Sequence, residues 1–399
     1  MEEKKTEKKP MELVMEKNPM EMTEEELYRA VAWKMKKGLK GKDGDYGYSK
    51  YLPLIFERML RGPEDARILL NLPGLPADIA PKVGMTEEEV ESRLNVLGDK
   101  AVAWLTRKGW FLPRSLVAQL HDAGLCVPKY DEEYGEEFFL LWQSFCRLEY
   151  WLDPNYYAGG IGDKTDQQKF SRVMPDHRAL AEDVELAPWE DLKAIFDILG
   201  EDGKLGAFLC SCGRARLGDP KMADPWKCIV WRRGYDYWNA KGGCVKTLNP
   251  DEMMAKIDKL HENGLVTTAP NGKNFPGAPG TQMFCNCHIN HCDVMLPAIL
   301  QGHTSQEVWS PSRYRMTVKS TDDCKACQKC VDICIFGAAQ MKYVPDSGIW
   351  HGGKYKAWVD PDKCMGCGNC ALVCPINNRV LELVRPAEHV PDEAPKIPE

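Results

Sequence analysis

Two closely similar cysteine runs constrain this chain more than any other feature of its sequence. Residues 324–334 read CKACQKCVDIC, and residues 364–374 read CMGCGNCALVC with a proline directly after them. In both runs, two residues, two residues and then three residues separate the four cysteines. Thiolates are soft ligands that suit iron–sulfur clusters, and a [4Fe–4S] cluster needs four of them. Paired zinc knuckles are the alternative, but two matching four-cysteine runs favour two iron–sulfur clusters.

The runs also predict which cysteines share a cluster. Three cysteines at this close spacing wrap around one cluster, and the fourth cysteine of a run binds the other cluster. We therefore expect crossed ligand sets, in which each run gives three ligands to one cluster and one ligand to the other. The expected ligands are Cys324, Cys327, Cys330 and Cys374 for the first cluster, and Cys364, Cys367, Cys370 and Cys334 for the second.

On these motifs, residues 320–385 resemble the bacterial-type two-[4Fe–4S] ferredoxin domain. The resemblance implies a ferredoxin-like fold with pseudo-two-fold symmetry, and an electron-transfer module of the kind found in anaerobic oxidoreductases. It also implies two clusters close enough for electrons to pass between them. The chain differs from the family pattern at Ile335, where a proline commonly follows the fourth cysteine, and the link between the runs is longer than in minimal ferredoxins.

Seventeen cysteines in 399 residues are better explained by metal ligation in a cytoplasmic protein than by disulfides, which concentrate in small secreted proteins. The middle of the chain allows three interpretations. The first is a third iron–sulfur cluster, with the ligands Cys210, Cys212, Cys228 and Cys244. The second is a further site in the stretch CNCHINHC, for iron or zinc, with the ligands Cys285, Cys287, Cys292 and either His288 or His291. The third places the two C-x-C pairs around a single metal.

Isolated Cys126 and Cys146 are expected to be buried thiols rather than ligands. The whole chain is also loosely similar to larger ferredoxin-type proteins of anaerobes, in which a helical or winged-helix front half and a CxC…CNC region precede the dicluster domain. The matching residues here are Cys210, Cys212, Cys285, Asn286 and Cys287. This wider resemblance implies anaerobic electron transfer and nothing more specific.

The stretch from residue 75 to residue 113 has the pattern of a winged helix-turn-helix. A short helix is expected to end at Gly84, and a second helix to begin at Thr86, which forms a capping box with Glu89. A β-hairpin is expected around residues 107–109. The second helix opens with three glutamates, and their charge is the wrong sign for contacts with phosphates. This domain is therefore expected to dock a protein or to be structural.

The expected fold class is α+β, multidomain, with five segments. These are a charged flexible tail at 1–20, a helical or winged-helix-like domain at 21–150, a cysteine-rich middle domain at 151–305, the dicluster ferredoxin-like domain at 306–385, and a flexible tail at 386–399. A net charge of −7 argues against nonspecific binding of nucleic acid. No apolar stretch is long enough to span a membrane and no secretory signal is evident, so a cytoplasmic location is expected.

The sequence therefore predicts an iron–sulfur protein that relays single electrons through two or more [4Fe–4S] clusters. Its expected partner is a redox protein or the other subunits of an anaerobic oxidoreductase, and it is expected to be a subunit more than a catalyst by itself. One alternative is a redox-sensing winged-helix regulator. Another is an enzyme that binds substrate at an open iron of a middle cluster, for which His288 and His291 are the only hint.

Overall fold

The computed structural model has a mixed α+β fold. It describes residues 14–35, 39–41, 44–47, 49–112, 117–149, 165–166, 169, 171–182, 184, 186–187, 189–214, 224–270, 283–345 and 353–390. By their contacts, the residues divide into two compact units, Met1–Asn155 and Tyr156–Glu399. The sequence predicts separate middle and C-terminal domains, and the contacts place both segments in the second unit.

The first unit is mostly helical, with two short antiparallel hairpins. Its helices are α2 (Glu24–Met35), α3 (Leu52–Met59), α4 (Pro63–Leu70), α5 (Pro76–Val83), α6 (Glu87–Asp99), α7 (Val117–Cys126) and α8 (Asp131–Leu148). Its hairpins are β1 (Leu39–Gly41) with β2 (Gly44–Gly47), and β3 (Trp104–Thr106) with β4 (Gly109–Phe111). The thiols of Cys126 and Cys146 are buried here, as the sequence predicts.

The local elements predicted for residues 75–113 are confirmed. Helix α5 ends at Gly84, which adopts the left-handed conformation that favours glycine. Helix α6 begins after Thr86, and the capping box between Thr86 and Glu89 is formed in both directions. The β3–β4 hairpin follows. These elements do not by themselves make a winged helix, and that interpretation stays a prediction.

The second unit is built on a seven-stranded mixed sheet with the order β11–β5–β9–β10–β7–β6–β8. The strands are β5 (Ser171–Val173), β6 (Leu205–Leu209), β7 (Trp226–Trp231), β8 (Val245–Thr247), β9 (Val266–Pro270), β10 (Met283–Cys287) and β11 (Trp309–Ser310). Only the pair of β11 and β5 is parallel, and the other neighbours are antiparallel. Residues far apart in the sequence therefore become neighbours on β7 and β10.

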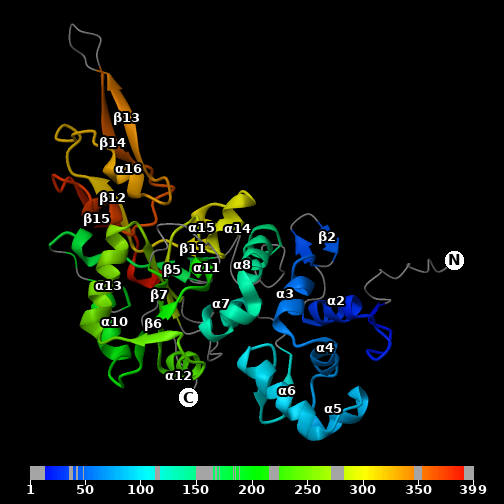
Figure 1. Ribbon diagram of the computed structural model, residues 1–399. Coiled ribbons are helices and arrows are strands. Elements are labelled where there is room, and N and C mark those ends of the chain that lie inside the picture. The colour runs from blue at the N-terminus through cyan, green and yellow to red at the C-terminus, as the bar shows by residue number, and fades with distance from the viewer. Residues whose placement is uncertain are drawn as a thin grey trace. The chain divides into compact units, whose positions relative to one another are not determined.

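Two helices cover one face of this sheet, α10 (Leu192–Leu199) and α13 (Pro250–Glu262), and Figure 1 shows them together beside β6 and β7. Helix α13 begins at a capping box that Asn249 and Glu252 form. Phe284 and Ile229 pack in the core with these helices. Successive side chains of a strand point to opposite faces. Cys285 and Cys228, the neighbours of Phe284 and Ile229, therefore point away from α10 and α13.

Further helices and turns belong to this unit. They are α11 (Ser211–Arg214), α12 (Arg232–Ala240), α14 (Met295–Leu300) and α15 (Ser305–Val308), with the 3-10 turns η4 (His177–Ala179) and η7 (Ala387–His389). Residues 386–390, predicted to start a loose tail, pack on the unit, since Val390 is buried and His389 Nε2 lies 2.7 Å from the carbonyl oxygen of Pro311.

The C-terminal part of the second unit carries both cysteine runs. It consists of the strand pairs β12 (Tyr314–Val318) with β15 (Arg379–Leu383) and β13 (Ala339–Pro345) with β14 (Gly353–Val359), and of the short helices α16 (Lys329–Ile333) and α17 (Asn369–Leu372). Figure 1 shows the β13–β14 hairpin extending beyond α16. Backbone hydrogen bonds join this part to the rest of the unit, from Asp176 to Cys367 and from Ser312 to Met365.

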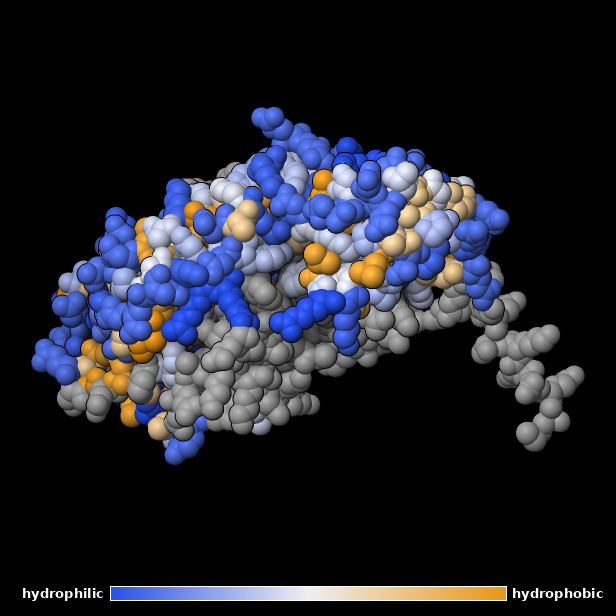
Figure 2. Space-filling model, turned by 90° about the horizontal axis from the view of Figure 1, so that it is seen from below, coloured by the Kyte–Doolittle hydropathy of each residue, from blue (hydrophilic) through white to orange (hydrophobic). Residues whose placement is uncertain are grey.

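The face of the molecule drawn in Figure 2 is mainly polar where its residues are described. Where Figure 2 draws described residues, hydrophilic side chains predominate and apolar ones lie scattered in small groups, which is ordinary for a protein surface. Among the described residues, no helix combines the length and the apolar character needed to cross a membrane.

Candidate metal centres

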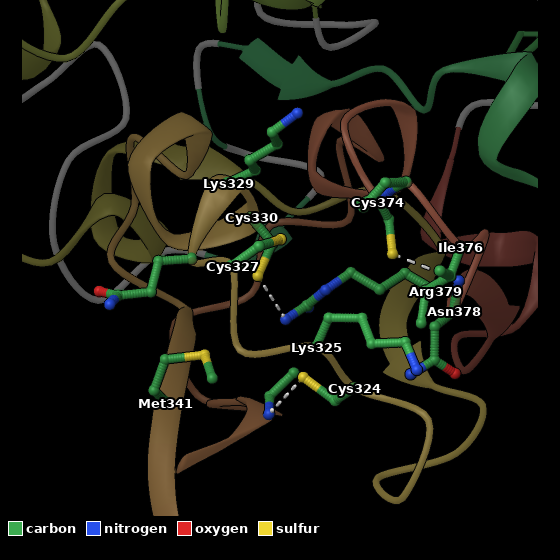
Figure 3. Close-up of a pocket in the computed structure, with 13 residues that line it drawn as sticks. Cys324, Lys325, Cys327, Lys329, Cys330, Met341, Cys374, Ile376, Asn378 and Arg379 are labelled. Atoms are coloured by element: carbon green, nitrogen blue, oxygen red, sulfur yellow. Dashed lines mark hydrogen bonds between the residues drawn. The ribbon is translucent and has the colours of Figure 1, made fainter.

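The first predicted ligand set surrounds a single cavity. Cys324, Cys327, Cys330 and Cys374 all line it, although Cys374 comes from the second run. Figure 3 shows the sulfurs of these residues around the same space, with Arg379 and Lys325 reaching into it. Helix α16 begins within the run, and its Cys330 faces the cavity. Three cysteines of the first run and one cysteine of the second thus form one compact set of four thiols.

The cysteines of the second predicted set also lie close to one another. The charges of Cys334, Cys364 and Cys370 each affect the pKa of Cys367. The charge of Cys334 also affects the pKa of Cys364 and of Cys370. The fourth cysteine of the first run therefore lies among the three of the second. Burial raises the pKa of the thiols of Cys364, Cys367 and Cys370. Their protons must therefore leave when a metal binds.

Arg379 is a functional candidate that the sequence analysis missed. Its Nη2 donates to the Sγ of Cys330 at 3.0 Å, and its Nη1 lies 4.0 Å from the Sγ of Cys370. One buried cation therefore contacts a cysteine of each set. Its only sequence signal is its position five residues after the last cysteine of the second run, which marks the start of β15.

Backbone N–H groups also point at the sulfurs of both sets. Cys324 accepts from Ala326 at 3.4 Å and from Ala357 at 3.3 Å, and Cys374 accepts from Asn378 at 3.3 Å. In the second set, comparable hydrogen bonds of 3.4 Å reach Cys364 from Met316 and Cys334 from Ala339. Such donors stabilise the negative charge of cluster-bound sulfur and help to set the reduction potential.

Six of the seven middle cysteines form a closed ring of hydrogen-bonded thiols. Going round the ring, each residue contacts the next, and the last contacts the first: Cys210, Cys212, Cys292, Cys287, Cys285 and Cys228. The two cysteine groups, which the first two interpretations of the sequence assign to separate sites and the third combines, therefore meet in one place. The physical reason is the sheet, which pairs β10 with β7 and so brings Cys285 beside Cys228.

The ring has the same kind of surroundings as the dicluster cysteines. Backbone N–H groups donate to Cys210 from Gly213 at 3.3 Å and to Cys212 from Asp293 at 3.4 Å. The buried ammonium of Lys227 lies close enough to Cys210, Cys228 and Cys287 for their charges to oppose the lowering of its pKa by burial.

The pKa values around the ring alternate. Hydrogen bonds from neighbouring thiols hold the pKa of Cys210 and Cys292 well below the usual value and lower that of Cys285 to about 6. The same hydrogen bonds raise the pKa of the three cysteines between them, which are Cys212, Cys228 and Cys287. The ring therefore accommodates negative charge on sulfur.

The other residues proposed for the middle sites have different surroundings. The Sγ of Cys244 donates to the carbonyl oxygen of Gly242 at 3.3 Å, and this thiol is not a member of the ring. The rings of His288 and His291 lie 5.2 Å apart, and both side chains are buried. The Nδ1 of His288 accepts from the backbone of Asn290. A ligand role for Cys244, His288 or His291 stays a prediction.

A buried chain of hydrogen bonds connects the ring to the second cysteine run. The backbone N–H of Asp176 donates to the carbonyl oxygen of Cys367 at 2.9 Å, and its carboxylate lies 2.7 Å from Nδ1 of His261. The Nε2 of His261 lies 2.7 Å from the hydroxyl of Thr267, which hydrogen-bonds Asn286 between two ring cysteines. All four of these side chains are buried, so the two sites share one rigid polar network.

Comparison with known proteins agrees with this geometry. Residues 323–378 match the model of the 4Fe-4S dicluster domain family, so this part of the chain defines an iron–sulfur protein with two [4Fe–4S] clusters. The described cysteines fit those clusters in number and in grouping. A dicluster domain of this kind indicates electron transfer.

Similarity to individual proteins is distant and partial. The pyruvate-flavodoxin oxidoreductase of Trichormus variabilis is 29% identical over 97 residues, which are 20% of this chain and 8% of that protein. A Synechocystis protein described as a pyruvate-flavodoxin oxidoreductase is 29% identical over 101 residues, which are 21% of this chain and 8% of its own length. The chain thus spans a small fraction of these relatives. No solved structure shows significant similarity to it.

Proposed function

We propose that this protein relays single electrons between its two [4Fe–4S] clusters and a redox partner, as a subunit of, or a dedicated donor to, an oxidoreductase of anaerobic metabolism. The observation that carries the proposal is the position of Arg379, whose guanidinium reaches Cys330 of one ligand set and Cys370 of the other. Two clusters that share contacts with one side chain are close enough to exchange electrons directly. The partial similarity to pyruvate-flavodoxin oxidoreductases supports this class of reaction.

The first cluster is the better candidate for exchange with the partner. In the first set Cys330 is buried, Cys324 and Cys374 are partly exposed and Cys327 is exposed. The second set has no exposed cysteine, since Cys364 and Cys370 are buried and Cys334 and Cys367 are partly exposed. Electron transfer slows with distance, so the more exposed cluster is the natural point of entry or exit. The second cluster then holds electrons inside the protein.

The β13–β14 hairpin lies beside this exposed cluster and offers the partner a contact surface. Its residues Tyr343, Val344 and Tyr355 are exposed. It also belongs to the cluster's own surroundings, because Met341 lines the cavity and Ala357 donates to Cys324. A partner bound to the hairpin would therefore be held next to the first cluster.

The N-terminal unit is better suited to docking another protein than to binding DNA. If α5, α6 and the β3–β4 hairpin act as a winged helix, the first turn of α6 would have to approach the phosphates. That turn exposes Glu87, Glu88 and Glu89, and carboxylates repel phosphates. The proposed role for this unit is attachment to a partner subunit.

Anaerobic reduction and reoxidation of the full chain test the relay. The wild-type protein is expected to contain about eight iron atoms and to take up about two electrons. Cys374→Ser removes a ligand of the first cluster, so electron transfer to a low-potential viologen dye should slow at least roughly tenfold, since one decade corresponds to about 1.4 kcal/mol of barrier. The second cluster should stay reducible.

Cys126→Ser is the matched control, because Cys126 is a buried thiol of the first unit. It should leave both iron content and transfer rate unchanged. Unchanged transfer in the Cys374→Ser protein, despite loss of about four iron atoms, would contradict the proposed exit through the first cluster. A wild-type protein whose clusters cannot be reduced would contradict the relay itself.

A further inference from the structure

The thiols of the middle ring are arranged differently from those of the dicluster domain. In the ring, every thiol is hydrogen-bonded to two others. Cys324, Cys327, Cys330 and Cys374 instead line a cavity. The two kinds of site therefore fit different metal centres.

The separation of ligand sulfurs distinguishes a bare metal ion from a cluster. Zinc binds thiolates at about 2.3 Å in a tetrahedron, which puts two sulfurs on one ion about 3.8 Å apart, in mutual contact. The terminal thiolates of a [4Fe–4S] cluster bind different corners of a cube and stay farther apart. Contacts between neighbouring thiols all round the ring match ligands that share an ion.

The number of thiols fixes how many ions the ring can hold. Two tetrahedral ions need about eight metal–sulfur bonds, and six thiolates provide them if four bind one ion each and two bridge both ions. Sulfurs opposite each other in the ring, such as Cys212 and Cys285, are placed to be the bridges. No ligand is then missing, and this is the property of a structural site.

The surroundings suit the charge of such a centre. Two divalent ions with six thiolates carry a net charge of roughly −2. The buried ammonium of Lys227 lies near three of the sulfurs and offsets part of that charge. Backbone N–H groups of Gly213, Asp293 and Met295 donate to Cys210, Cys212 and Cys292 at 3.3 to 3.4 Å. Backbone N–H donors of the same kind surround the dicluster cysteines.

We propose that Cys210, Cys212, Cys228, Cys285, Cys287 and Cys292 together hold two zinc ions in a closed, all-thiolate, binuclear site. The ions join the end of β6, the strand β7, the strand β10 and the turn before α14, which are distant in the sequence. Zinc is redox-inert, so the site fixes the sheet that supports the dicluster domain and carries no electrons. This proposal is independent of the proposed electron relay.

Metal analysis of the full chain tests the proposal directly. Protein purified without oxygen, with its clusters intact, is expected to contain about two zinc ions beside about eight iron atoms and eight sulfides. Zinc X-ray absorption should show sulfur alone in the first shell, at about 2.3 Å, and a second metal nearby. One zinc ion, no zinc, or about twelve iron atoms without zinc would overturn the proposal.

A pair of serine variants gives a second readout. Cys228→Ser should lower the zinc content and leave about eight iron atoms in place. Cys244→Ser should retain the full zinc content, because Cys244 lies outside the ring although it is also buried. Equal loss of metal in both variants would favour a site that includes Cys244 and would overturn the proposed ligand set. Iron and zinc are measured separately, so failure here leaves the relay untouched.

Discussion

The guanidinium of Arg379 donates a hydrogen bond of 3.0 Å to the Sγ of Cys330 in the interior of the dicluster domain. Its other terminal nitrogen lies 4.0 Å from Cys370. A buried cation favours the more negative, reduced state of a neighbouring cluster. Arg379 should therefore raise the reduction potentials of both clusters.

Replacing Arg379 tests this effect. Arg379→Gln is expected to make both potentials more negative by roughly 40 mV, which is about 1 kcal/mol for one electron. Arg379→Lys keeps the charge but loses the forked geometry, so its potentials should fall between those of the wild type and those of Arg379→Gln. Redox titration followed by EPR measures the reduction potentials of both clusters. Lys193→Gln removes an exposed cation from α10 and serves as control; a shift of the same size in that variant would disprove a specific role for Arg379.

Gly366 is expected to be indispensable for the second cluster. Its φ is +70°, and a Cβ there would lie 2.2 Å from both Ser312 Oγ and the carbonyl oxygen of Tyr314. Gly366→Ala should therefore destabilise the second unit by more than about 3 kcal/mol and lower the iron content. Gly337→Ala is the matched control, because Gly337 has a φ of +64° and open space around it. Gly337→Ala should therefore cost only the strain of a left-handed backbone, about 1 kcal/mol of the free energy of unfolding. Equal stability of the two variants would contradict the predicted clash.

Asp176 is expected to stabilise the link between the middle ring and the second cysteine run. Its buried carboxylate contacts His261 at 2.7 Å and Arg178 at 2.9 Å. Asp176→Asn should destabilise the protein by about 3 kcal/mol, because it breaks a buried charge network. Asp258→Asn removes a more exposed partner of the same Arg178 and should cost less than about 1 kcal/mol. Denaturant unfolding compares the two variants, and similar losses would refute the role of burial.

The carboxyl group of Asp176 should stay ionised between pH 6 and pH 8. Burial by itself would raise the pKa of Asp176, but hydrogen bonds from His261 and Arg178 outweigh burial and hold that pKa well below its ordinary value of 3.8. A carboxyl group with a depressed folded pKa stabilises the fold fully above its unfolded pKa and loses that effect only at lower pH. The titration of Asp176 itself is therefore predicted to contribute no change in the free energy of unfolding over this range.

His389 is predicted to make the C-terminal segment sensitive to acid. Burial lowers the pKa of His389 from 6.5, and the charge of Arg385 lowers it further. The carbonyl of Pro311 and the charges of Asp166 and Glu190 raise it, but burial outweighs them. A histidine with a depressed folded pKa stabilises the fold above its unfolded pKa and loses that effect as the pH falls. The protection factors of the amides of residues 387–390 against hydrogen exchange should therefore decrease as the pH falls below about 6.5.

Two histidine variants check this prediction. His389→Gln can still donate to the carbonyl of Pro311 but does not titrate, so its exchange should lose the extra pH dependence. His177→Gln changes an exposed histidine and should behave like the wild type. If the protection factors of this segment follow the same pH profile in all three proteins, His389 is not the titrating group.

Local signals in the sequence were sufficient for several elements. The capping residue Thr86 begins its helix as predicted, because a cap depends on residues only three positions apart. Met254, Ile257 and Leu260 are buried, as their helical spacing indicates. The cluster cysteines were equally predictable, since three ligands of each cluster lie within seven residues of one another.

The middle cysteines could not be grouped from the sequence. Spacing along the chain favoured Cys244 as the partner of Cys210, Cys212 and Cys228, whereas the structure puts Cys292 in the ring. The choice depends on which strands are neighbours, and strand order is a property of the whole sheet. Arg379 was missed for a related reason, because nothing in its local sequence shows that it turns toward sulfur.

The sequence by itself determined the chemistry of this protein: soft thiolate ligands, two clusters in a dicluster domain, and a transfer of electrons. Tertiary structure alone decided that β10 lies beside β7, and so that six thiols from separate segments form one ring. It also decided which cation lies between the clusters. Ligand type and short spacing are covalent properties of the chain, whereas neighbours across a sheet are chosen by the burial of Phe284, Ile229 and the rest of the core.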